Sequence, residues 1–222
     1  MPTAILEPLL HSPLLVDYIE ELAQALRDEQ GLRAKFLEEM TEDGKWEFIN
    51  GEIICHSPAA SRHISASDRL FILMNTFVDV HQLGVVLHEK ALVRFPRNDY
   101  EPDIVFFGHQ KAALITPEMF VHPVPDLAVE VLSPSTKKND RGIKFEDFGR
   151  HGVAEYWIID PIRQQVEVFV NQGEGQGFPA KTLPVFGDAL VRSELLDGFY
   201  LPAKAIFDSK ANLLALTRLV KG

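Results

Sequence analysis

The sequence predicts an α/β fold, in which a mixed central sheet is flanked by helices and preceded by a hairpin. Segments with apolar residues at helical spacing alternate with short runs rich in β-branched and aromatic residues. Between residues 125 and 160, a strand-like run, a helix-like run and a second strand-like run follow one another. This order is typical of a crossover between neighbouring strands, and it favours the α/β class.

The N-terminal part predicts helices and then a hairpin. Apolar residues keep helical spacing from Leu14 to about Met40, and Gly31 predicts a break between two helices that cover a sheet. The alternating runs KWEFIN and EIICHS meet at Asn50-Gly51. This dipeptide is the strongest short-range signal for a β-hairpin, because both turn residues must adopt positive φ.

The central part predicts one long helix followed by three strands. Helical spacing resumes after Pro58 and ends at a glycine in SRHISASDRLFILMNTFVDVHQLG. The strands predicted next are GVVLHEKALVRF, DIVFF and LAVEVL. A helix from about Asp140, with Gly149 or Gly152 near its end, then leads into the strand AEYWIID.

The C-terminal part predicts further strands and a closing helix. QVEVFV and the LPVF region are strand-like, NQGEGQGFPA is typical of a hairpin loop, and ANLLALTRLV is amphipathic. Nothing divides the chain into two domains. We expect one domain over residues 1–222, with a helical segment at about 1–42, a core at about 43–170, and C-terminal strands and a helix at about 171–222.

Composition excludes several classes of protein. A net charge of −10 argues against a protein that coats nucleic acid by bulk electrostatics. A bound cation would nevertheless reverse the negative electrostatic field around a local cluster of carboxylates. No apolar stretch approaches the roughly 20 residues that cross a bilayer. The N-terminus lacks the basic start and small-residue cleavage site of a secretory signal, so we expect a cytoplasmic protein without membrane contact.

Two carboxylates in strand-like runs are candidates for chemistry. Asp103 stands at the head of an apolar strand, and Glu130 lies between Val129 and Val131. Because an unpaired buried charge is costly, such an acid needs a cation or a hydrogen-bonded partner. On neighbouring strands the two could hold Mg²⁺. Alternatively, Asp103 caps a turn and Glu130 pairs with a structural cation, while Asp126 could join the site or cap the strand start.

A nuclease site also needs a positive group near the scissile phosphate. Lys144 is the best candidate, because it lies on the helix that directly follows the Glu130 strand and can project back over the carboxylates. Lys137, Lys138 and Arg141 could contact a nucleic acid backbone. The alternative for this basic run is an ordinary solvated helix face.

The motifs PDIVFF, PDLAVEVLSPST, DRGIKFEDFGRHGV and EYWIIDP resemble the Uma-two family of bacterial endonucleases, and the hairpin WEFINGEI resembles that family's opening segment. The resemblance covers residues 30–170. It implies a restriction-endonuclease-like fold of the PD-(D/E)XK superfamily, with Asp103 and Glu130 as metal ligands. The lysine expected two residues after the acid is replaced by Leu132, and the resemblance implies that Lys144 stands in for it.

The resemblance also implies an acid near the N-terminus as a further metal ligand. Glu52 is favoured and Glu47 is close behind, because side-chain parity on the hairpin does not choose between them. His63, at the start of the long helix, could contact the metal-bound water or a phosphate, or could be a capping group.

The leading hypothesis is therefore an endonuclease that hydrolyses phosphodiester bonds in DNA with Mg²⁺ or Mn²⁺, in which Asp103, Glu130 and Lys144 are catalytic. The missing lysine at Leu132 and the acidic net charge favour an alternative, a catalytically weak or inactive nucleic-acid-binding domain of the same fold. A third hypothesis is an unrelated metal-dependent hydrolase. A homodimer would suit cleavage of two strands, and the stretch LLALTRL could form its interface or belong to the core.

Overall fold

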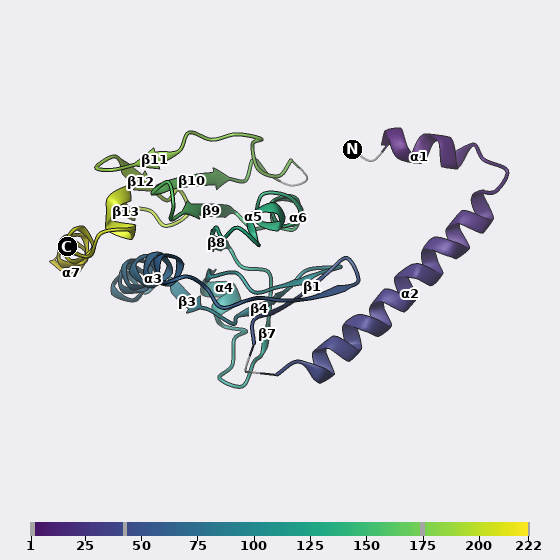
Figure 1. The fold of residues 1–222 in the computed structure, drawn as a ribbon, viewed down its shortest axis with the longest axis horizontal. Helices are drawn as coiled ribbons and strands as arrows, with labels where there is room; N and C mark the ends of the chain where they lie inside the picture. Colours follow the sequence, from purple (N-terminus) through teal and green to yellow (C-terminus); the bar gives the residue numbers. More distant parts are fainter. Residues whose placement is uncertain (1–2, 42–43, 174–175, 222) are drawn as a thin grey trace. The chain divides into compact units, whose positions relative to one another are not determined.

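The structure, a computed structural model, describes residues 3–41, 44–173 and 176–221. Its internal contacts divide the chain into two compact units, Met1–His56 and Ser57–Gly222. Figure 1 follows the chain through both. Since compact units can belong to one domain, the single domain expected over residues 1–222 stays a prediction.

The first unit begins with two helices, α1 (Thr3–Leu10) and α2 (Leu15–Glu39). The predicted break at Gly31 is wrong, because α2 continues through it without interruption. A glycine inside a helix costs only about 1 kcal/mol relative to alanine, and its neighbours are good helix formers. In α2, Phe36 is buried and contacts Phe48 with 5.8 Å between ring centroids, whereas Leu22 and Leu26 are exposed. Within this unit, α2 therefore packs against β1 through its last turns.

The hairpin of the first unit is confirmed. It pairs β1 (Trp46–Ile49) with β2 (Glu52–Cys55) in antiparallel register, with Ile49 opposite Glu52. Asn50 and Gly51 have φ angles of 51° and 84°. Positive φ at both positions is the requirement of the tight turn that Asn-Gly predicts.

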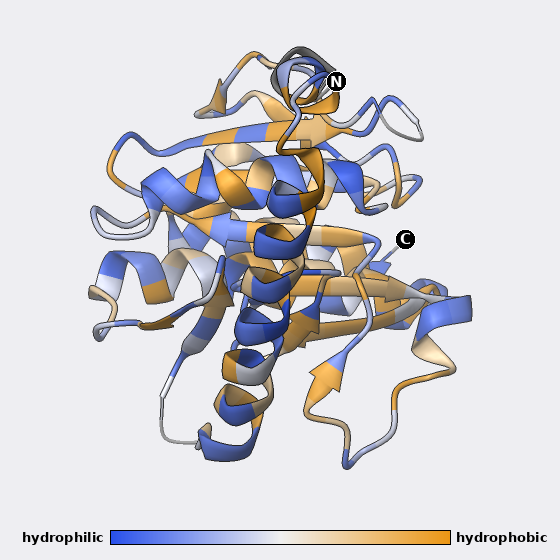
Figure 2. Ribbon diagram, turned by 90° about the vertical axis from the view of Figure 1, so that its right-hand side faces the viewer, coloured by the Kyte–Doolittle hydropathy of each residue, from blue (hydrophilic) through white to orange (hydrophobic). Residues whose placement is uncertain are grey.

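The second unit is built around a mixed six-stranded sheet, which confirms the predicted α/β class. The strand order is β11-β10-β9-β8-β6-β3, and only β8 and β9 run parallel among the described pairs of this sheet. Figure 2 shows that these strands are largely hydrophobic, as expected for a sheet covered on both faces. The strands are β3 (Gly84–His88), β6 (Ile104–Gly108), β8 (Leu127–Val131), β9 (Glu155–Asp160), β10 (Gln165–Val170) and β11 (Val185–Phe186).

The crossover from β8 to β9 contains two short helices, α5 (Lys137–Asp140) and α6 (Ile143–Arg150), which lie beside β8 and β9 in Figure 1. The single helix predicted from about Asp140 is thus interrupted. At Gly142 an added Cβ would lie 2.7 Å from the Lys138 carbonyl oxygen, so only glycine fits this close passage of the chain.

The opposite face of the sheet packs against α3 (Ser61–His81), the 3₁₀ helix η1 (Ala203–Ile206) and α7 (Ser209–Lys221). Leu70 and Met74 of α3 share one buried cluster with Val129 and Trp157 of the sheet. α7 adds Ala211, Ala215 and Leu219 to this cluster, whereas Leu213 and Leu214 are exposed. The predicted C-terminal amphipathic helix is therefore confirmed.

Shorter elements complete the second unit. The single strand predicted from GVVLHEKALVRF is wrong, because positive φ angles of 51° and 50° at Glu89 and Lys90 turn the chain between β3 and β4. β4 then pairs with β5 and β7. No helix in the described ranges is both long and apolar enough to cross a bilayer. The remaining elements are β4 (Leu92–Arg94), β5 (Asp99–Tyr100), α4 (His109–Ala112), β7 (Val121–His122), β12 (Leu190–Arg192) and β13 (Tyr200–Pro202).

Candidate active site

Asp103, the residue before β6, lies opposite Glu130 of the neighbouring antiparallel strand β8. Ile104 is paired with Val129, so the continued register places Asp103 across from Glu130. Directly opposed residues share one face of a sheet. Both side chains are buried, with 3% and 2% of each residue exposed. The sheet thus brings the two predicted carboxylates together on the face that α6 covers.

The Asp103 carboxylate has contacts at both oxygens. Its Oδ2 accepts a hydrogen bond from the Val131 backbone N–H at 2.7 Å, and its Oδ1 lies 3.3 Å from Nε2 of His63. His63 belongs to the first turn of α3, and its side chain is mostly buried. The fold therefore brings His63, which the sequence offered only as an additional candidate, to the first predicted metal ligand.

Lys144 reaches the same place from α6. Its Nζ lies 2.8 Å from Glu130 Oε1 and 3.3 Å from Asp140 Oδ1, and all three side chains are nearly inaccessible to solvent. Ions buried in this way are stable only when they are paired in good geometry. The predicted approach of Lys144 to Glu130 is observed, while the catalytic role of the pair stays a prediction.

Asp140 and Tyr156 belong to this cluster, and the sequence analysis missed both. Asp140 stands four residues before Lys144, a spacing at which two side chains can meet on one helical face, and this signal could have found it. The Tyr156 hydroxyl donates to the Asp140 carbonyl oxygen at 3.0 Å. Burial raises the pKa of Tyr156 well above its ordinary value, and the nearby charges of Glu130 and Asp140 raise it further. The phenol therefore remains a hydrogen-bond donor.

Aromatic packing holds α6 on the sheet. The buried ring of Phe148 contacts the rings of Phe95, Tyr100 and Tyr156, with centroids 5.0 to 5.3 Å apart. Lys144 is one helical turn before Phe148, so the same side of α6 carries the ring and the ammonium group. The apolar contacts thus fix the helix from which Lys144 extends.

The two acids expected to complete the site lie on the hairpin of the first unit. Glu47, in β1, is buried, and its Oε2 lies 2.9 Å from Nε2 of His56. Glu52, in β2, is exposed beside the tight turn. A metal-binding role for Glu52, or for Glu47 in its place, stays a prediction.

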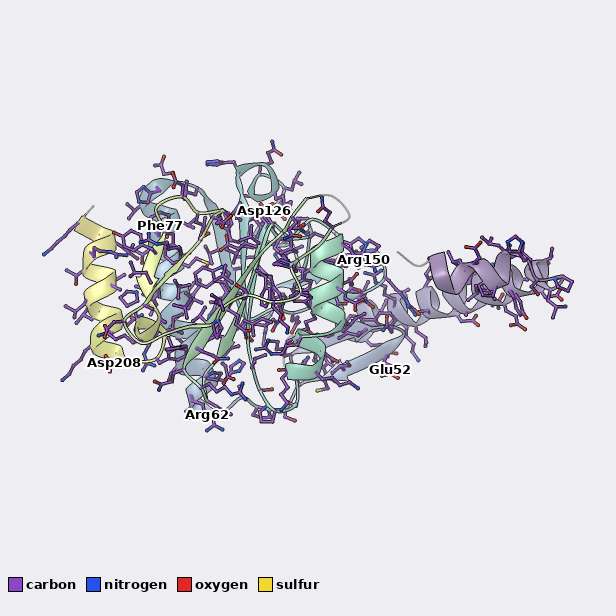
Figure 3. The ribbon with its side chains drawn as sticks, turned by 90° about the horizontal axis from the view of Figure 1, so that it is seen from above. Glu52, Arg62, Phe77, Asp126, Arg150 and Asp208 are labelled. Atoms are coloured by element: carbon purple, nitrogen blue, oxygen red, sulfur yellow. The ribbon has the colours of Figure 1, made fainter. Side chains whose placement is uncertain are left out.

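Asp126 has a structural environment. Its Oδ2 accepts a hydrogen bond from the Gly108 backbone N–H at 2.7 Å, and its Oδ1 lies 2.6 Å from Nζ of Lys111. Figure 3 shows Asp126 and Arg62, the neighbour of His63, at opposite ends of the second unit. Asp126 therefore holds the end of β8 that lies away from the site, as the capping alternative predicted.

The predicted basic run lies on and just after α5. Lys137 and Lys138 are exposed, and the exposed Arg141 forms an ion pair with Glu167 of β10. Two lysines are thus accessible to a polyanion, while Arg141 is engaged within the protein. Contact with nucleic acid stays a prediction for all three.

The donor set can be compared with the needs of a metal ion. In the part of the chain that the structure describes, no three His, Cys, Asp or Glu side chains are gathered as a metal site. Mg²⁺ usually takes one or two carboxylates and keeps several water ligands. The opposed carboxylates of Asp103 and Glu130 offer the hard oxygen donors that Mg²⁺ or Mn²⁺ prefers, so these residues fit such an ion.

Comparisons with known proteins bear on the fold and on the family of the chain. The model of the Uma2 family, described as "Putative restriction endonuclease", matches residues 33–204. The fold is similar to the crystal structure of "a putative nuclease belonging to DUF820 from Anabaena variabilis ATCC 29413". The TM-score is 0.66 at 22% identity, over 78% of this chain and 94% of that chain. No curated protein matches this sequence.

The solved structure bears on the fold, and its likeness confirms the predicted restriction-endonuclease-like architecture. The family model bears on descent, because it covers most of the chain and includes the strands and helix that carry Asp103, Glu130 and Lys144. The resemblance inferred from the sequence motifs is thereby confirmed, and the chain belongs to the Uma2 family.

Proposed function

We propose that this protein is a metal-dependent endonuclease that hydrolyses phosphodiester bonds in DNA. The observation that carries the proposal is the buried Lys144 ammonium, 2.8 Å from Glu130, on the sheet face shared with Asp103. A carboxylate pair with a nearby lysine can hold a divalent cation and place a positive charge beside an attacked phosphate, which supports metal-dependent phosphodiester hydrolysis. Membership of a family described as "Putative restriction endonuclease" supports the same reaction and suggests DNA as the substrate.

Each residue has a distinct task in the proposed reaction. Asp103 and Glu130 would hold Mg²⁺ or Mn²⁺. When bound, such an ion lowers the pKa of a water ligand and stabilises charge on the attacked phosphate. Lys144, as an ammonium group, would orient the attacking water and stabilise the negative charge that develops on the phosphate. Asp140 and Glu130 hold the ammonium group at its place.

The position of the lysine departs from the superfamily pattern in a physically simple way. Leu132 occupies the position two residues after Glu130. The residue at 132 has the same parity along β8 as Glu130, and α6 covers that face. A long side chain from α6 can therefore serve the same carboxylate as one from the strand.

Further parts of the proposal concern the surroundings of the site. Glu52, or Glu47 in its place, would add a carboxylate to the metal, and Lys137, Lys138 and Arg141 would contact the DNA backbone. A homodimer would suit two-strand cleavage, because two sites related by a two-fold axis match the symmetry of a duplex.

The test is cleavage of supercoiled and single-stranded DNA in the presence of Mg²⁺ or Mn²⁺. We expect nicking by the native protein and its loss in Asp103→Asn, Glu130→Gln and Lys144→Met. Glu146→Gln and Lys210→Met alter exposed charges and serve as matched controls that keep activity. Circular dichroism of each variant separates lost chemistry from lost folding.

Leu132 stands where the superfamily pattern has a lysine. This departure favours one alternative, a nucleic-acid-binding domain without turnover. That alternative predicts DNA binding by the native protein without cleavage under any of these conditions. If all three site variants cleave DNA as well as the native protein does, the activity comes from a contaminating nuclease. The proposed function would then be rejected.

A further inference from the structure

Asp147 joins α6 to the chain segment that leads into β5. Its Oδ2 accepts hydrogen bonds from Nδ2 of Asn98 and from the hydroxyl of Tyr100, both at 2.8 Å. Its Oδ1 lies 2.9 Å from Nδ1 of His151, one helical turn later. Asn98 and Tyr100 are buried, and the Asp147 side chain is mostly buried. Both carboxylate oxygens are therefore engaged, and one of them connects α6 to a different part of the fold.

The hydrogen bonds of Asp147 constrain α6 in a way that its apolar packing does not. The burial of Phe148 contributes mainly through the area removed from water, and this attraction is non-directional. Hydrogen bonds, in contrast, weaken steeply when they are bent. α6 has only eight residues and follows the break at Gly142, so its exact place depends on tertiary contacts of this directional kind.

Lys144 depends on the place of α6, because it stands three residues before Asp147 on the same helical surface. Its Nζ lies 2.8 Å from Glu130 Oε1 and 5.8 Å from the centroid of the Tyr100 ring. Tyr100 thus contacts the ammonium group with its ring and Asp147 with its hydroxyl. A charge that stabilises a transition state must be aligned in advance, and a misplacement of about 1 Å can cost roughly a hundredfold in rate.

We propose that Asp147 is a positioning residue for Lys144. By holding Asn98 and Tyr100, it keeps α6 where the ammonium group reaches Glu130. The inference rests on the proposed function, in which Lys144 acts on the attacked phosphate. It adds to that function a carboxylate whose effect reaches the reaction only through the lysine.

The first test is the kinetics of DNA cleavage by variants of the full-length protein. Asp147→Ala removes both acceptor oxygens, and we expect it to lower kcat about tenfold or more while KM for DNA changes little. Asp147→Asn keeps an amide oxygen that can accept the same bonds, so it should retain more of kcat than the alanine variant. Tyr100→Phe removes one of the two bonds and keeps the ring, and it should also give a smaller loss.

Asp126→Ala is the matched control. Asp126 also accepts a backbone N–H, at 2.7 Å from Gly108, and contacts Lys111, but at the end of β8 that lies away from the site. Both alanine variants should lower Tm, because each leaves donors without their acceptor. Only Asp147→Ala should lower kcat when the two are compared below their transitions.

The second readout is the nuclear magnetic resonance signal of the Lys144 ammonium group in ¹⁵N-lysine-labelled protein, identified by its loss in Lys144→Arg. We expect Asp147→Asn to shift or broaden this signal and Asp126→Asn to leave it unchanged. If Asp147→Ala affects kcat no more than Asp126→Ala does, or if the ammonium signal stays as in the native protein, Asp147 only stabilises the fold and this inference is overturned alone. If the native protein does not cleave DNA, the proposed function is overturned and the catalytic part of this inference with it, while the ammonium signal still decides whether Asp147 places Lys144.

Discussion

Replacement of Lys144 by methionine would test whether the ammonium group holds the site together. Lys144 is 1% exposed and contacts Glu130 and Asp140 at 2.8 and 3.3 Å, and these carboxylates are also buried. Removal of one partner from a buried ion pair costs roughly 3–5 kcal/mol, because the remaining charge has lost its compensation. Here two carboxylates lose the same partner, so we expect Lys144→Met to reach at least the lower end of this range.

Glu130→Gln should lower the free energy of unfolding less than Lys144→Met does. That variant leaves Lys144 in contact with Asp140, so the ammonium group stays paired, and the expected cost is roughly 1–3 kcal/mol. The double variant should cost less than the sum of the two single ones, since it removes both members of the pair. At about 2–4 °C per kcal/mol for a chain of this size, Lys144→Met should lower Tm by roughly 6–20 °C.

Urea unfolding followed by circular dichroism and by the fluorescence of the buried Trp157 would measure these differences. The two signals must coincide for the free energies to be compared. Two results would contradict this prediction: Lys144→Met could be as stable as the native protein, or Glu130→Gln could cost more than Lys144→Met. Either result would mean that the ammonium group does not compensate both carboxylates.

Three further predictions concern other buried polar groups. Tyr156→Phe removes the hydrogen bond to the Asp140 carbonyl and should cost about 1 kcal/mol; because the pKa of Tyr156 is raised by burial, its loss should not change the ultraviolet tyrosinate titration below the alkaline unfolding transition. Glu155 accepts bonds from Trp157, Ser193 and the 194–195 backbone, so Glu155→Gln should cost roughly 1–3 kcal/mol in urea unfolding. Burial raises the pKa of Glu155, so native stability should fall relative to this variant as pH rises above 4.5, and a parallel pH profile would contradict this. Burial lowers the pKa of His122, so native stability should fall as pH drops below 6.5 and His122→Leu should lessen that slope; equal slopes would refute the assignment.

Local chemistry explains what the sequence could predict. The hairpin followed from Asn50 and Gly51 alone, and the approach of Lys144 to Glu130 followed from a short connection between a strand and the next helix. In both cases, the residues that determine the geometry are close together in the chain. The family motifs fall in the same segments, which explains why the resemblance was readable.

Tertiary packing explains what the sequence analysis missed. Gly31 is a weak break signal that the surrounding helix formers outweigh. The turn at Glu89 and Lys90 contains neither glycine nor proline, so propensity gave no sign of it. Tyr156 joins the site only because α6 packs across β9, a contact that no local pattern reports.

The last prediction concerns the place from which the lysine reaches the site. Leu132 continues the extended chain of β8, because its N–H donates to the Ile159 carbonyl oxygen at 2.8 Å. A lysine there would start about 6.6 Å along the strand from Glu130 and emerge on the same face. In a Lys144→Met background, Leu132→Lys should therefore raise DNA cleavage about tenfold, a partial recovery of the roughly 10²–10³-fold that one electrostatic donor contributes.

Leu132→Met in the same background is the matched control, because it changes the side chain without adding charge. If the lysine variant folds and binds Mn²⁺ but recovers no more activity than this control, the site depends on more than an ammonium group near Glu130. The contact with Asp140, which only a lysine on α6 makes, would then be part of what the reaction requires. Recovery would instead mean that a lysine on either the strand or the helix can supply the positive charge. The replacement of the expected lysine by Leu132 would then not by itself imply lost catalysis.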